Sequence, residues 1–180
     1  VYVWVIVPLL CGLIGDFTSG SNPFGFIAQL GARLTRTSRP WPRRLGWWLA
    51  VVLLALGTLA ELVFNQTTTL PRVIAWMLIG YAAFCCGMGA VFGAASFRAR
   101  GELFSVLFGA WGLLGFFRFG APGRRGFAGG LDTPFERTVS RLVFVLMLLV
   151  SISFDGILST PQWARFERRT ITFANLHEQY

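Results

Sequence analysis

The longest uncharged stretch of the chain runs from Val73 to Phe97 and contains 25 residues. A bilayer's hydrocarbon layer is about 30 Å thick, and a helix crosses it in about 20 apolar residues. Helices of globular proteins average only about 10–14 residues. The stretch therefore predicts a membrane-spanning helix.

The composition and the placement of charge agree with a lipid environment. The chain is 54% hydrophobic and 13% charged, and its 16 basic residues give a net charge of +8. Those basic residues are all arginine and gather between apolar runs, as in the positive-inside pattern. The two main groups are Arg33, Arg36, Arg39, Arg43 and Arg44, and Arg118, Arg124, Arg125, Arg137 and Arg141. We expect anionic lipid headgroups, and not nucleic acid, as the partner of this charge.

The apolar runs predict an all-α, polytopic transmembrane helix bundle. Four spans are expected, at Val1–Gly15, Leu45–Phe64, from Val73, and at Leu142–Leu158, followed by a polar tail over 164–180. Two shorter segments, Pro23–Leu34 and Leu103–Phe117, predict interfacial or re-entrant helices because they are too short to cross.

The beginning of the chain is strongly apolar and has neither an initiator Met nor a basic leader. We therefore expect a middle piece of a longer multi-pass protein, whose remaining spans would be partners of this one.

Local signals refine these boundaries. Asn22-Pro23 predicts a helix start, with Asn as the cap and Pro at the first helical position. Thr133 to Glu136 predicts a capping box before the last span. In the third span, Gly87, Gly89 and Gly93 lie at spacings of four with Ala83 or with each other, which predicts close helix packing.

The two halves of the chain follow the same order of features. Units 1–64 and 73–158 each read as a span, an acid, a short Phe- and Gly-bearing segment, an Arg-rich loop and a second span with one acid near its far end. This order predicts a parallel tandem repeat, an arrangement that transporters use to place a site between repeats.

Acids inside the spans are the candidate functional residues, because a charge at the bilayer centre costs at least about 2.5–3.5 kcal/mol. Asp155, together with Ser151 and Ser153, predicts a polar surface along a substrate path. Glu61 is either part of the same path or reaches headgroup water from its position near the span's end. Asp16 and Glu102, at span ends beside arginines, predict interfacial salt-bridge partners.

Other reactive residue types give no site. Cys11, Cys85 and Cys86 all lie in apolar runs and predict helix-packing residues. His177 is the single histidine, so neither a histidine-based metal site nor a Ser-His-Asp triad is predicted. The sequence therefore assigns no catalytic residue, no metal and no cofactor.

Several motifs together carry a resemblance to a known family. They are Val3-Trp4-Val5, Gly15-Asp16, Asn22-Pro23-Phe24, Arg44-Leu45-Gly46-Trp47, Ala60-Glu61-Leu62-Val63, Leu103 to Gly109, Ser153-Phe154-Asp155-Gly156 and Thr160-Pro161-Gln162-Trp163. In order and spacing the chain resembles bacterial multi-pass membrane proteins labelled fenitrothion hydrolase. The resemblance implies the middle of a longer polytopic protein, with a histidine-bearing segment further along.

Two functions follow as hypotheses. The first is a protein of the bacterial inner membrane, transporter-like or a scaffold, with acids lining a path between helices. The second is a membrane-embedded hydrolase of organophosphate-type esters, whose catalytic groups would come largely from outside this chain.

Overall fold

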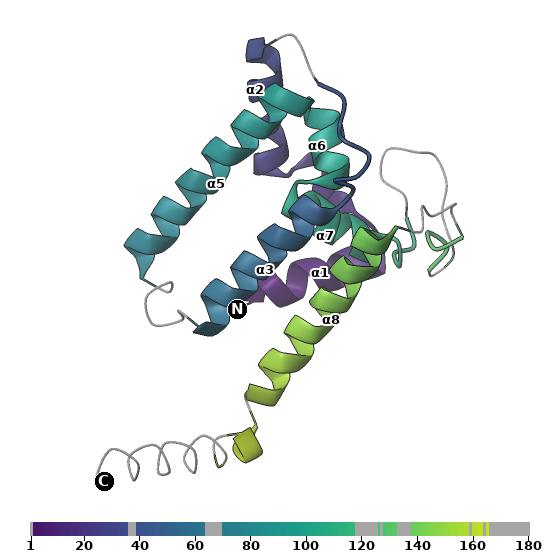
Figure 1. Ribbon diagram of the computed structural model, residues 1–180. Coiled ribbons are helices and arrows are strands. Elements are labelled where there is room, and N and C mark those ends of the chain that lie inside the picture. Colours follow the sequence, from purple (N-terminus) through teal and green to yellow (C-terminus); the bar gives the residue numbers. More distant parts are fainter. Residues whose placement is uncertain are drawn as a thin grey trace. The chain divides into compact units, whose positions relative to one another are not determined.

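The computed structural model describes residues 2–35, 39–63, 70–117, 126, 128–132, 138–158, 160–163 and 165 (Figure 1). All regular elements in these ranges are helices, which confirms the all-α class. The chain divides into two units, residues 1–144 and 145–180, and the last long helix passes from the first into the second.

The helices follow the predicted apolar runs. They are α1 (Tyr2–Ile14), the 3-10 helix η1 (Phe17–Gly20), α2 (Pro23–Thr35), α3 (Trp48–Val63), α5 (Pro71–Phe92), α6 (Ala94–Arg100), α7 (Leu103–Gly112) and α8 (Val139–Leu158). The predicted start of α2 at Pro23 is confirmed. Among the described residues, α5 is the one helix long and apolar enough to cross a membrane. The predicted capping box at Thr133 to Glu136 lies outside the described residues.

The prediction of one continuous helix over Val73–Phe97 is wrong at its C-terminal end. The helix stops at Phe92, because Gly93 has φ 77° and ψ 141°. That conformation is essentially restricted to glycine and is incompatible with a continuing helix. Gly93 therefore separates α5 from α6.

The closest packing in the first unit joins α2 to α5, which lie side by side (Figure 1). An added Cβ at Gly31 would overlap the carbonyl of Cys86, and one at Gly89 would overlap the carbonyl of Ala28. Gly89 thus lies at the backbone contact, whereas a Cβ at Gly87 would meet nothing within 4 Å. Small residues on both helices permit this approach.

The segment before α3 supplies part of the core. Trp41 is buried, and its indole N–H donates to the carbonyl oxygen of Gly46 at 3.2 Å. Its ring packs against Phe92 and Phe97, at the end of α5 and in α6. The Arg-rich loop of the first predicted unit is therefore anchored by an aromatic side chain.

The other close helix pair is α1 with α7. A Cβ at Gly112 would lie 2.6 Å from the Cβ of Asp16, and the backbone N–H groups of Phe116 and Phe117 donate to Leu13 and Ile14 at 3.1 and 2.8 Å. Both close pairs join a helix from the first predicted repeat unit to one from the second. The first unit of the structure thus interleaves the two halves of the sequence.

Candidate functional site

The first unit contains one fully buried carboxylate, Glu102, among the residues described. The backbone N–H of Gly101 and that of Glu102 both donate to the carbonyl of Phe97, which ends α6. Glu102 then adopts an extended conformation and becomes the N-cap of α7. The turn between two short helices thus brings an acid into the protein interior.

Four donors surround this carboxylate. The Tyr81 hydroxyl donates to Oε1 at 2.6 Å, and the Asn22 amide donates to Oε2 at 2.6 Å. The backbone N–H groups of Phe104 and Ser105 donate at 3.1 and 2.7 Å, as expected at a helix N-terminus. All four partners are neutral donors, an arrangement that suits the charged form of a carboxylate, which only accepts.

Asn22 joins the N-termini of α2 and α7. Its Nδ2 donates to Glu102 and also to the Ser105 hydroxyl at 2.9 Å, while its Oδ1 accepts from the backbone N–H groups of Phe24 and Gly25 at 3.0 and 3.3 Å. One amide therefore caps α2 and holds the cap of α7. Buried polar groups that are satisfied in this way fix the relative position of the elements that carry them.

The residues around this junction correspond between the two helices. Asn22 and Glu102 are both N-caps that accept from the second and third backbone N–H groups of their helix. Phe24 and Phe104 occupy the same place after the cap, and their rings stack with centroids 5.4 Å apart and an interplanar angle of 15°. Tyr81 of α5 packs edge-on against both rings, at 4.6 and 5.7 Å. Asn22 and Glu102 therefore have the same capping role, although the order of features in the two halves of the sequence sets the acid Asp16 against Glu102.

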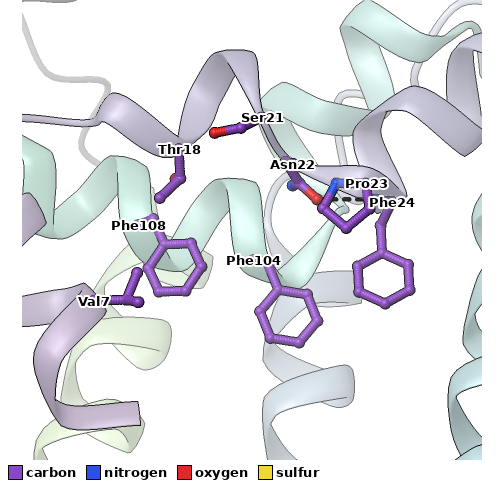
Figure 2. Close-up of a pocket in the computed structure, with 8 residues that line it drawn as sticks. All are labelled: Val7, Thr18, Ser21, Asn22, Pro23, Phe24, Phe104 and Phe108. Carbon is purple, nitrogen blue, oxygen red and sulfur yellow. Dashed lines mark hydrogen bonds between the residues drawn. The ribbon is translucent and has the colours of Figure 1, made fainter. Parts of the chain in front are cut away.

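A pocket of about 250 Å³ lies beside this junction (Figure 2). Its lining combines aliphatic and aromatic side chains with three small polar ones: Val7, Thr18, Ser21, Asn22, Pro23, Phe24, Phe104 and Phe108. The polar side chains come from the η1 segment that leads into α2, and two of the rings come from α7. A mainly apolar cavity with a few polar groups is the usual form of a small-molecule site.

The prediction that Glu102 is an interfacial ion-pair partner is not supported by its surroundings. It has 0% exposure, and its partners are an amide, a phenol and backbone N–H groups. Arg98, four residues earlier, donates instead to the carbonyl of Ser19. Burial explains the difference, because a carboxylate in the interior needs several donors and the fold supplies them from α2 and α5.

Asp16 is half-buried between α1 and η1, and it accepts a hydrogen bond from the Thr18 hydroxyl at 2.8 Å. It lies against the end of α7 through its contact with Gly112. Each acid therefore accepts a hydrogen bond from a residue that lines the pocket, Asp16 from Thr18 and Glu102 from Asn22.

The other predicted site residues lie elsewhere. The backbone of Glu61 is in α3 and that of Asp155 in α8, but their side chains are outside what the structure describes. Ser151 donates to the carbonyl of Leu148 at 2.9 Å, and Ser153 is exposed. The path predicted from these four residues stays a prediction.

Three residues of the junction were missed from the sequence: Asn22 as a partner, Tyr81 and Ser105. The bond from Asn22 to Glu102 joins residues 80 positions apart, which no local pattern reveals. A signal did exist, since Tyr81 is a hydroxyl in the middle of an uncharged run and Glu102 is an acid between two apolar segments.

Within the described residues, no group of three or more His, Cys, Asp or Glu side chains is close enough to hold a metal ion. Comparisons with known protein families, with curated proteins and with solved structures find no match.

Proposed function

We propose that this chain is part of a multi-pass membrane protein that binds a small molecule in the pocket beside Asn22 and carries it across the bilayer. The observation that carries the proposal is the junction itself. Two short helices, α2 and α7, begin at the same buried polar cluster and a pocket adjoins it. Transporters place substrate sites where interrupted helices begin or end within the membrane.

The surface of α5 supports a membrane location. Only 11% of its most apolar window is buried within the chain. Residues 74–80 are exposed around the whole helix, and they include Trp76, Met77, Leu78 and Ile79. An apolar helix of this length without a covering protein surface is suited to lipid.

The arrangement of the helices supports an internal repeat. The pairing of α1 with α7 and of α2 with α5 is reciprocal, and the capping residues Asn22 and Glu102 correspond. Reciprocal contacts of this kind are expected when two related units pack on each other around a pseudo-two-fold axis. The remaining spans, α1, α3 and α8 with helices beyond this chain, would complete the bundle.

The hydrolase alternative rests on the resemblance alone. No observation in the described residues favours it over binding and transport, so it stays a prediction. A scaffold would need no access to the pocket, and accessibility therefore separates it from a transporter.

The test is labelling of Ser21→Cys with a membrane-impermeant maleimide in uniformly oriented proteoliposomes. Ser21 lines the pocket, is exposed, and makes only a long hydrogen bond of 3.5 Å to Phe17, so the change disturbs little. Peptide mass spectrometry measures the labelling at position 21 separately from that of the native cysteines. These cysteines therefore need not be replaced. The matched control is Ile79→Cys, on the lipid-facing part of α5.

A transporter exposes its site alternately, so position 21 should be labelled by reagent added to either face, in different molecules. Position 79 should stay unlabelled from both. Labelling of position 21 from one face or from none would contradict the proposed function.

A further inference from the structure

We propose that the pocket takes a small organic cation, an ammonium group on a compact apolar body. This inference rests on the proposed function only in taking the pocket as a ligand site. It follows from the direction of the hydrogen bonds of the polar lining residues, the acids that these residues contact and the aromatic rings that line the pocket.

The polar side chains of the wall donate their hydrogens away from the pocket. Thr18 donates to Asp16 at 2.8 Å, and Asn22 donates to Glu102 and to Ser105 at 2.6 and 2.9 Å. The hydroxyl of Ser21 points back to the carbonyl of Phe17. The donor hydrogens of these side chains are therefore used within the protein, and an anionic ligand would need free donors.

Two carboxylates contact these lining residues from the side away from the pocket. Asp16 accepts from Thr18, and Glu102 accepts from Asn22. Among the described residues, the hydrogen-bond partners of Glu102 are all neutral, and none of those that line the pocket is basic. Arg98, a cation of the adjacent α6, donates to the carbonyl of Ser19 and lies against Gly25, not against the carboxylate of Glu102. A buried charge that neutral donors stabilise keeps its long-range field, because surrounding protein screens it much less than water does.

Aromatic rings line much of the rest of the pocket. Phe24, Phe104 and Phe108 line the pocket, and the last two stack with centroids 6.1 Å apart (Figure 2). The faces of such rings attract cations, and recognition of quaternary ammonium groups depends on this interaction. Rings and acids therefore favour the same ligand charge.

The volume limits the ligand's size. An engineered apolar cavity of about 150 Å³ holds benzene, so 250 Å³ admits one ring or its equivalent with a small ammonium substituent. Larger amphiphiles would have to extend out of the pocket.

The experiment measures how far a bound probe protects the thiol introduced by Ser21→Cys from the impermeant maleimide. Two probes of similar shape and opposite charge are used at millimolar concentration, benzyltrimethylammonium and benzenesulfonate. We expect the ammonium, at about ten times its Kd, to slow labelling about tenfold, because the unoccupied fraction falls as 1/(1 + [L]/Kd). The sulfonate should leave the rate unchanged. Equal protection by both probes, or none by the ammonium, would overturn the inference.

Two variants test whether the protection depends on the aromatic rings that line this pocket. Phe108→Leu removes one ring from the pocket while keeping an apolar side chain, and it should weaken protection by the ammonium severalfold. Phe26→Leu changes an α2 ring that is 57% exposed and outside the pocket, and should have no effect. Equal effects of the two changes would count against the site.

The two proposals fail separately. Protection by the ammonium with labelling from one face alone would end the transport proposal and leave the cation site. Labelling from both faces without a difference between the two probes would end the cation-site proposal and leave the transport proposal. No labelling from either face would overturn both, because a sealed site admits no ligand.

Discussion

Removal of the Glu102 side chain should destabilise the protein more than any other single acid substitution in the described residues. In Glu102→Ala the helix α7 loses its N-cap, which costs about 1 kcal/mol. The Tyr81 hydroxyl loses its acceptor while the side chain stays partly buried among rings, which costs about 1–3 kcal/mol. Asn22 keeps one partner, the Ser105 hydroxyl at 2.9 Å, and adds little. We expect the free energy of unfolding to fall by about 3 kcal/mol.

The measurement is unfolding in mixed micelles by titration with a denaturing detergent, followed by tryptophan fluorescence. The control is Asp132→Ala, at an exposed acid, which should change the free energy by less than about 0.5 kcal/mol. Glu102→Gln should fall between them, since it keeps one carbonyl acceptor but turns an N–H group toward a donor. If Glu102→Ala cost no more than the Asp132 control, the junction would not hold α2 and α7 together.

Three further predictions use the same unfolding assay. Gly89→Ala should cost about 1–3 kcal/mol by overpacking against α2, whereas Gly87→Ala, which meets open space, should be neutral or stabilise the helix by up to about 1 kcal/mol; equal effects would refute the close contact. Gly93→Ala should cost about 1–3 kcal/mol, because its φ of 77° suits glycine alone, and an unchanged stability would mean that the break after α5 is absent. Tyr81→Phe should cost about 1 kcal/mol in the wild-type background and much less in Glu102→Ala, since the two groups share one hydrogen bond; additive effects would argue against that bond.

The sequence predicts the elements of this fold better than their contacts. The Asn22-Pro23 start, the length of the apolar runs and the short helix after Glu102 all depend on local rules, and the structure follows them. The predicted end of α5 is wrong because a hydropathy pattern treats Gly93 as one more uncharged residue. The helix ends there because Gly93 adopts a φ of 77°, which hydropathy does not predict.

The candidate site was harder to predict for a physical reason. The cost of burying Glu102 depends on donors from α2 and α5, and these meet it only after the chain has folded. From the sequence, the nearby arginines are the obvious partners. The structure instead satisfies the acid with an amide, a phenol and two backbone N–H groups.

If the proposed function holds, α5 lies in lipid while the pocket beside Asn22 is open to water. Spin labels at Ile79→Cys and Ser21→Cys, in nanodiscs, test it most directly through their collision rates with oxygen and with a water-soluble nickel chelate. We expect high oxygen and low nickel accessibility at position 79, and high nickel accessibility at position 21. High nickel accessibility at position 79 would contradict it, because α5 would then lie in water.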